Sequence, residues 1–282
     1  MVPKVLCAGD QALTVEFSDR IDAEVNARVI AFAEALRAEP EAGVREVVPS
    51  YRSLLVLYDP EIVRGAALAE RLDRRAAAIG DAGGEARLWR VPMRFGGSAG
   101  LDFEEMARMK GLSADELVAV FTEPEYRVYM IGFAPGFAYL GGLPERLHTP
   151  RLPTPRQRLE AGAIGIGGAQ ANINSVPGPS GWRFLGRTPV RLFDPARPQP
   201  FLFRAGDAVR FFPIGEAEGR DLDAAVLERA DVRLVRERVV EHLADDLHHR
   251  VLRVLQHARE DDGAVLGGER LVTVAVHPDH RH

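Results

Sequence analysis

The amino-acid sequence predicts a small α+β domain, then a β-barrel or sandwich domain, and finally a helical extension. Strand-like and helix-like segments alternate as far as about residue 87. Short apolar runs separated by dense Gly and Pro fill residues 130–212, which is typical of β domains with long loops. Apolar residues then recur at helical spacing over residues 234–257. We therefore expect domains at residues 1–87, 88–215 and 216–282.

The first domain contains two segments of each kind. Residues 5–17 and 46–58 are rich in Val, Leu and aromatic residues, as strands are. Residues 22–38 place their apolar side chains on one helical face, and residues 61–79 predict a second helix. This order favours an α+β domain of ferredoxin-like type. The single cysteine, Cys7, excludes an internal disulfide, and we expect a buried thiol.

The second domain is expected to open with a strand over residues 88–95 and two short helices. Asp102–Glu105 and Ser113–Glu116 both have the capping-box pattern that begins a helix. Gly111 is expected to end the first of these helices. In the third region, residues 263–276 predict a hairpin after the long helix.

Composition excludes several classes of function. A net charge of −5 without a Lys/Arg run argues against nucleic acid as a partner. No apolar stretch approaches the roughly 20 residues that span a bilayer, and no signal peptide is expected. We therefore expect a cytoplasmic protein. Neither Lys4 nor Lys110 lies in a Walker A loop, and His242, His248 and His249 match no metal-binding pattern, so no metal site is predicted.

Two near-matches to catalytic motifs are better explained as local structure. Gly96–Gly100 fits G-x-S-x-G, but the acid and histidine of a triad do not follow, so a Gly-rich turn is favoured. Met109-Lys110 is similar to the Met-Lys-Met of biotin carriers, but Gly111 follows, and Lys110 is interpreted as a solvated cation at a helix end. The catalytic residues stay unknown.

The first informative loop covers residues 129–144. It contains Tyr129, Phe133 and Phe137, and Pro135-Gly136 helps to fix its path. One interpretation is a barrel rim that folds over its own core. The other is a ligand-binding wall, in which glycines let backbone N–H groups approach an anionic or amide ligand. The residues leave both open.

The second informative loop runs from residue 165 to residue 189. Gln170 can both donate and accept hydrogen bonds, which suits the edge of an amide or lactam. Arg187 followed by Thr188 is suited to grip a carboxylate or phosphate. The alternative is that Arg187 pairs internally, for example with Asp194.

These loops carry a resemblance to a known family. Residues 130–145, Thr149-Pro150-Arg151, Thr154-Pro155-Arg156, the Gln170 segment, Gly181-Trp182 and residues 186–189 follow the family's order and spacing. Upstream, Gly9-Asp10, residues 48–56 and Tyr58-Asp59-Pro60 are also similar. Over residues 5–215 the chain resembles the 5-oxoprolinase B subunit family, also called allophanate hydrolase subunit 1.

The resemblance implies an α+β N-terminal domain, a cyclophilin-like β-barrel and activity only within a complex. The complex is an ATP-dependent amide or lactam hydrolase that opens 5-oxoproline to L-glutamate. Its expected members are a homologous C subunit, similar to allophanate hydrolase subunit 2, and a separate A subunit, with ATP and Mg²⁺ as cofactors. The expected substrate-binding residues orient the amide (Gln170, Asn172, Asn174), clamp the anion (Arg187, Thr188) or form and seal the walls (Tyr129, Phe133, Pro135, Gly136, Phe137, Trp182).

The sequence also departs from the family pattern at residues 169–176 and at Ser180, which leaves the choice of amide substrate open. Two alternative functions therefore stand beside the first. One is the carboxyltransferase component of a biotin-dependent urea or amide carboxylase, with biotin carried on another chain. The other is a non-enzymatic inhibitor of a histidine kinase. No residue is an obvious nucleophile, which favours an active site shared with a partner.

Overall fold

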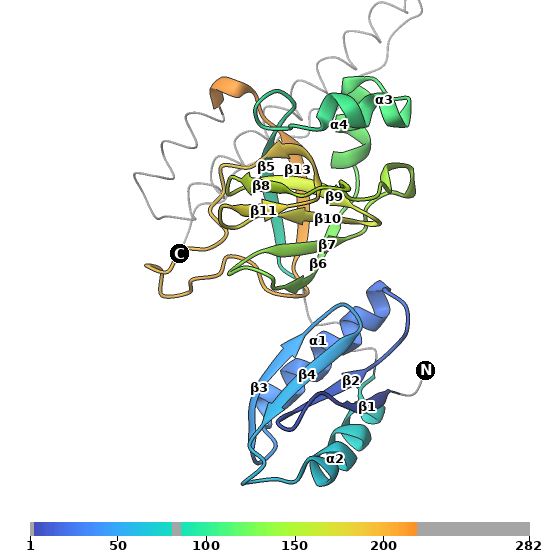
Figure 1. Cartoon of the computed structure of the whole chain (residues 1–282), viewed down its shortest axis with the longest axis vertical. Coiled ribbons are helices and arrows are strands. Elements are labelled where there is room, and N and C mark those ends of the chain that lie inside the picture. The colour runs from blue at the N-terminus through green and yellow to red at the C-terminus, as the bar shows by residue number, and fades with distance from the viewer. Residues whose placement is uncertain (1–2, 81–85, 219–282) are drawn as a thin grey trace, which may run out of the picture. The chain divides into compact units, whose positions relative to one another are not determined.

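The computed structural model describes residues 3–80 and 86–218 of the chain (Figure 1). These residues form a four-stranded sheet with two helices, followed by a closed β-barrel with two further helices. The predicted helix at residues 234–257 and the predicted hairpin at residues 263–276 lie outside the described residues.

The N-terminal sheet is antiparallel and has the strand order β1-β2-β4-β3. Its strands are β1 (Lys4–Cys7), β2 (Ala12–Glu16), β3 (Val44–Pro49) and β4 (Ser53–Tyr58), and its helices are α1 (Ala23–Ala38) and α2 (Gly65–Ala78). Both helices contribute to one core with the same face of the sheet, because Val15, Val56, Phe32 and Leu68 belong to a single cluster of buried side chains. Each fully buried side chain of this kind contributes about 1.5–3 kcal/mol.

Each strand predicted in this part of the chain is in fact a hairpin. Gly9 turns the chain between β1 and β2 with a φ of 83°, a conformation that glycine adopts without strain. Between β3 and β4 the Ser50 N–H donates to the Ser53 carbonyl at 2.8 Å and closes a turn. The element order is therefore ββαββα, and the ferredoxin-like order βαββαβ is not confirmed. Cys7 lies on the edge strand β1 and is exposed, so the prediction of a buried thiol was wrong.

The predicted helices of this part are present. Asp22 caps α1 by accepting hydrogen bonds from the N–H groups of Glu24 and Val25 at 2.8 and 3.2 Å. α2 begins at Gly65, later than predicted, because the Asp59 carboxylate accepts the Glu61 N–H and holds the chain in a turn.

The second part of the chain is the predicted β-barrel. Its seven strands close in the order β10-β7-β6-β13-β5-β12-β9, and only β5 and β13 pair in parallel. They are β5 (Leu88–Phe95), β6 (Tyr126–Ile131), β7 (Ala138–Gly141), β9 (Ala163–Gly167), β10 (Gln170–Ile173), β12 (Arg183–Arg187) and β13 (Ala208–Pro213). A short helix η1 (Glu145–Leu147) and a two-stranded sheet of β8 (Arg156–Leu159) and β11 (Gly178–Ser180) complete it.

Two helices, α3 (Phe103–Lys110) and α4 (Ala114–Thr122), lie side by side against the barrel (Figure 1). The capping box predicted at Ser113 is confirmed, with Glu116 as its second member. The box predicted at Asp102 is wrong. Although Asp102 precedes α3, its side chain makes no cap, because two other groups occupy the carboxylate.

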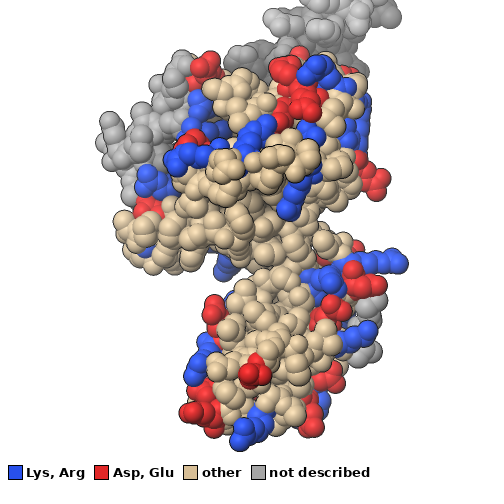
Figure 2. All heavy atoms as spheres, viewed as in Figure 1, with Lys and Arg blue, Asp and Glu red and all other residues tan. Residues whose placement is uncertain are grey.

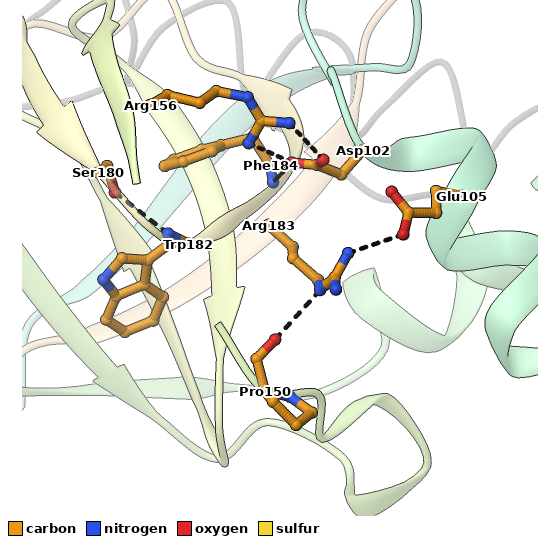
Figure 3. A network of polar contacts seen from close by, with 8 residues as sticks. All are labelled: Asp102, Glu105, Pro150, Arg156, Ser180, Trp182, Arg183 and Phe184. Atoms are coloured by element: carbon orange, nitrogen blue, oxygen red, sulfur yellow. Dashed lines mark hydrogen bonds and ion pairs between the residues drawn. The ribbon is translucent and has the colours of Figure 1, made fainter. Parts of the chain in front are cut away.

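The buried Asp102 carboxylate joins three segments of the barrel (Figure 3). It accepts hydrogen bonds from both terminal nitrogens of Arg156, at 3.0 and 2.6 Å, and from the Phe184 N–H at 2.7 Å. A two-pronged arginine–carboxylate contact is among the stronger hydrogen-bonded pairs in proteins. The carboxylate therefore ties the start of α3 to β8 and β12.

Surface charges of the two signs are intermixed. On the face seen in Figure 2, the Lys and Arg side chains of the barrel lie among Asp and Glu, and no continuous basic surface covers it. Within residues 3–80 and 86–218, no helix has both the length and the apolar character needed to cross a membrane.

We predict that Asp102→Ala lowers the free energy of unfolding by about 3 kcal/mol, because it leaves the Arg156 guanidinium and the Phe184 N–H without their acceptor. Urea unfolding measures the change. Glu160→Ala is the control, since it removes the exposed Arg158–Glu160 pair and should cost less than about 1 kcal/mol. Equal, small losses in both variants would contradict the role of Asp102.

Candidate functional site

Aromatic side chains form a connected series on one side of the barrel. Phe137 contacts Phe133, Tyr139 and Trp182, with ring centroids at 5.5, 4.6 and 6.4 Å. Tyr139 also contacts Trp182 at 6.0 Å. The rings come from the β6–β7 loop, from β7 and from the residue before β12. The structure thus brings together three of the aromatic residues predicted from sequence.

Tyr51, from the turn between β3 and β4, extends this series. Its ring contacts Tyr129 at 6.0 Å and Tyr139 at 5.7 Å, edge to face in both cases. Its hydroxyl donates to Gln170 Oε1 at 3.0 Å. The buried Asn26 amide fixes the backbone here, because Nδ2 donates to the carbonyls of Tyr51 and Tyr129 at 3.3 and 3.0 Å.

The tyrosine hydroxyls of this cluster keep their protons at neutral pH. Burial raises the pKa of Tyr51 above its ordinary value, and the neighbouring Tyr139 adds to the rise, while Arg151 and Gln170 oppose it. Burial likewise raises the pKa of Tyr129 and of Tyr139. Tyr51 is therefore a hydrogen-bond donor, and by donating to Oε1 it leaves the Gln170 NH₂ group as the donor that the amide can offer to a ligand.

Arg151 is a cation in contact with this cluster. Its guanidinium lies over the Trp182 ring at 4.6 Å from the centroid, within the range of a cation–π contact. The two side chains lie against Gly167, where a Cβ would come within 2.7 Å of Trp182 Cε3 and 3.1 Å of Arg151 Nε. Only glycine leaves this space on β9. Arg151 also acts electrostatically on Tyr51 and Tyr139. None of the ion pairs found within residues 3–80 and 86–218 involves Arg151.

The backbone around Arg151 is held on both sides. The Thr149 N–H and carbonyl pair with Gly168 at 3.1 and 2.7 Å, and the Leu152 N–H donates to the Gly181 carbonyl at 2.7 Å. Between them, Arg183 Nε donates to the Pro150 carbonyl at 3.1 Å, while Nη1 of the same side chain binds Glu105 at 3.0 Å (Figure 3).

A further contact holds the segment just before Arg151. Lys110 Nζ donates to the His148 carbonyl at 2.6 Å, so the prediction of a solvated Lys110 was wrong. The fold of the second half of the chain therefore fixes the segment that carries Arg151 before any ligand arrives.

Asn172 and Asn174 lie deeper in the structure. Both are buried, and Asn172 Nδ2 donates to Asn174 Oδ1 at 2.9 Å. Asn172 is the direct cross-strand partner of Tyr139, so it lies on the same face of the sheet as the aromatic residues. The two asparagines thus form a buried hydrogen-bonded pair beneath the aromatic residues of that face.

The described hydrogen bonds of Arg187 and Thr188 do not involve the aromatic series. Arg187 Nε donates to the Ala161 carbonyl at 2.9 Å, and Thr188 Oγ1 accepts the Val190 N–H at 3.1 Å. The proposed internal pairing of Arg187 with Asp194 is not found, because the described partners of Asp194 are Arg191 and Arg197. The role of Arg187 as an anion clamp stays a prediction.

The loop of Phe133, Pro135 and Gly136 has one unusual residue. Phe133 is 74% exposed and has a φ of 68°, and it is the only residue other than glycine with positive φ in the described parts of the chain. A bulky residue in this region is strained by roughly 1–2 kcal/mol. Gly136 is buried, and a Cβ there would come within 2.9 Å of Phe193 Cβ, so this glycine serves close packing within the chain. Pro135 is exposed.

Tyr51, Tyr139 and Arg151 belong to the cluster but were not among the residues predicted from sequence to bind substrate. Tyr51 and Arg151 lie in Pro49-Ser50-Tyr51-Arg52 and Thr149-Pro150-Arg151, outside the two loops, and the Tyr51 segment is distant from Gln170 along the chain. Their motifs were visible in the sequence, but their proximity depends on the fold. Among the described residues, no three of His, Cys, Asp and Glu gather to hold a metal ion.

We predict that the free energy of unfolding falls as the pH rises above about 10. Burial raises the folded pKa of Tyr51, Tyr126, Tyr129 and Tyr139, four of the chain's five tyrosines. As the pH rises, the unfolded chain therefore loses these protons before the folded chain does. The stability that is fully present below the unfolded pKa is lost as the pH rises toward the higher pKa values of the folded state. Ultraviolet titration of tyrosinate in native and urea-unfolded protein tests this. Parallel ionisation of all five tyrosines in both states would contradict it.

The comparison with known proteins identifies the family. Residues 3–203 match the model of the carboxyltransferase domain, subdomain C and D. The chain is 37% identical over 221 residues to the 5-oxoprolinase B subunit of Bacillus subtilis (strain 168), which covers 74% of this chain and 92% of that protein. It is 38% identical over 206 residues to the 5-oxoprolinase B subunit of Escherichia coli O157:H7, covering 73% and 93%.

Solved structures share the fold. TTHA0988 matches with a TM-score of 0.66 and 36% identity over 73% of this chain and 40% of that chain. Kluyveromyces lactis urea amidolyase matches with a TM-score of 0.67 over 78% of this chain and 15% of that chain, at 20% identity, which shows the fold alone. This chain spans less than half of either solved chain. The sequence relatives and the family match together show that the chain belongs to the carboxyltransferase-domain family of subdomains C and D, in the group of the 5-oxoprolinase B subunits.

Proposed function

We propose that this chain is the B subunit of a 5-oxoprolinase complex, which opens 5-oxoproline to L-glutamate at the expense of ATP. The observation that carries the proposal is the match to proteins named as 5-oxoprolinase B subunits, which extends over 92–93% of their length. The site is compatible with this substrate class, because it combines a donor amide, aromatic rings and an arginine without a described carboxylate partner.

The side chains of the cluster suit binding rather than bond breaking. Tyr51, Tyr129 and Tyr139 keep their protons, and Arg151 and Gln170 are donors, so none of them is an activated nucleophile. A lactam amide is unreactive and requires activation of one of its atoms. We therefore assign to this chain the orientation of the substrate and the exclusion of water, and we propose that the activating groups belong to partners.

The proposed partners are a homologous C subunit, similar to allophanate hydrolase subunit 2, and a separate A subunit. The proposed cofactors of the complex are ATP and Mg²⁺. Among the described residues, no His, Cys, Asp and Glu cluster is suited to a metal ion, and the Mg²⁺ is proposed to accompany ATP in the complex. We place the complex in the cytoplasm, where ATP is available and an exposed single thiol such as Cys7 is ordinary.

Two other functions are separated from this one by experiment. The likeness to urea amidolyase concerns the fold alone, so a biotin-dependent carboxyltransferase requires a biotin carrier on another chain. An inhibitor of a histidine kinase requires a kinase as partner. Both can be assayed with the same purified chain.

We predict no turnover of 5-oxoproline by the chain alone, and ATP-dependent release of glutamate once the partner chains are added. Glutamate formation and ATP hydrolysis are measured together, with each component omitted in turn as the control. Full turnover by the isolated chain would contradict the shared site. Urea carboxylation with a biotin carrier, or inhibition of kinase autophosphorylation, in the absence of 5-oxoproline cleavage would replace the proposed function.

A further inference from the structure

We propose that Arg151, seated on Trp182, binds the carboxylate of a small ligand whose carbonyl is bound by Gln170. This inference rests on the proposed function and adds to it the ligand class of the site, a compact carboxylate that also carries a lactam or amide. It assigns the anion-binding role to Arg151 in place of the expected clamp, Arg187.

The first step of the argument is the state of Arg151. Arginines with a structural role donate hydrogen bonds to a carboxylate or a carbonyl of the chain, as Arg156 does to Asp102 and Arg187 does to the Ala161 carbonyl. The Arg151 side chain is exposed, and in the part of the chain that the structure describes it ends on the face of an indole ring. A stacked guanidinium keeps all its N–H groups in one plane and available to a two-pronged acceptor. A carboxylate is the small anion that matches this fork.

The second step is the placement of Gln170 beside this arginine. Gly167, against which the Arg151 side chain lies, is the direct cross-strand partner of Gln170 at the β9–β10 turn. Directly opposed residues of an antiparallel pair project to the same face, about 4.5–5.5 Å apart. The arginine and the amide therefore lie on one face at one end of the hairpin.

The third step is the polarity of the Gln170 amide. Tyr51 remains protonated and donates to Oε1, which leaves the NH₂ group of the amide to donate to a ligand. The NH₂ group is a donor and therefore selects a carbonyl oxygen. The half-buried ring of Tyr139, between Tyr51 and Trp182, supplies an apolar surface for the carbon atoms between the two polar ends.

The three parts together describe 5-oxoproline, in which a short saturated ring separates a carboxylate from a lactam carbonyl. A free phosphate can pair with Arg151 but has no carbon atoms to contact the Tyr139 ring and no carbonyl to accept from the Gln170 amide. A simple lactam satisfies the amide and the ring but leaves the arginine unpaired. These differences allow each part of the site to be tested with a ligand that lacks one group.

The experiment measures binding to the full chain by calorimetry with four probes: 5-oxoproline, 2-pyrrolidinone, cyclopentanecarboxylate and inorganic phosphate. We expect the wild-type chain to bind 5-oxoproline most tightly. Arg151→Gln should lower the affinity for 5-oxoproline and cyclopentanecarboxylate about ten- to a hundredfold and leave the affinity for 2-pyrrolidinone unchanged. Gln170→Leu should lower the affinity for the two lactams, 5-oxoproline and 2-pyrrolidinone, and leave the affinity for cyclopentanecarboxylate unchanged. Arg151→Lys should lie between wild type and Arg151→Gln, because lysine keeps the charge without the fork.

Arg158→Gln is the matched control, since this exposed arginine pairs with Glu160 and should leave all four affinities unchanged. The crossed pattern of variants and ligands separates binding from folding, because a folding defect weakens every ligand equally. Equal loss of 2-pyrrolidinone and 5-oxoproline in Arg151→Gln overturns the proposal. So does phosphate that binds as tightly as 5-oxoproline, or a wild-type chain that does not bind 5-oxoproline at millimolar concentration.

Failure of this inference is distinguishable from failure of the proposed function. A reconstituted complex that cleaves 5-oxoproline with Arg151→Gln as well as with the wild-type chain keeps the proposed function and overturns the role of Arg151. A complex that never cleaves 5-oxoproline, combined with Arg151-dependent binding of the carboxylates, overturns the proposed function and keeps the site.

Discussion

The carboxylate of Asp102 is the buried charge on which the order of the candidate site depends. It binds Arg156 on β8 and the N–H of Phe184 on β12. These contacts fix β12, which begins with Arg183, the residue directly before Phe184. Arg183 in turn holds the carbonyl of Pro150, next to Arg151. A buried charge tolerates few arrangements of its partners, because each lost partner leaves an uncompensated group. The buried contacts of Asp102 therefore help to hold the backbone next to the exposed Arg151 in place.

The site combines electrostatics of two opposite kinds. The tyrosine cluster is apolar enough to keep its hydroxyls protonated, while the Arg151 guanidinium lies at the exposed edge of the same cluster. An anion that reaches the arginine therefore meets neutral donors and aromatic rings next to it. The role proposed for this arrangement is to hold and desolvate a small acid.

Phe133 shows a feature that folding alone does not explain. The residue combines a left-handed backbone with a large exposed ring, and each is unfavourable for an isolated chain in water. It lies at the open end of the aromatic series that leads through Phe137 to Trp182.

The Gly- and Pro-rich composition of residues 130–212 indicated a barrel or a sandwich, and the family resemblance indicated the barrel. Local chemistry determined helix α1 with its Asp22 cap and the capping box at Ser113, because these depend on near neighbours. It also placed Gln170 and the aromatic residues in the two informative loops. The hairpins in place of single strands, and the diversion of Asp102 from its helix to Arg156, were decided by tertiary structure. So was the meeting of Tyr51, Arg151 and Gln170. Tyr51 and Gln170 are 119 positions apart in the chain, and proximity over such a separation follows only from how the fold packs them.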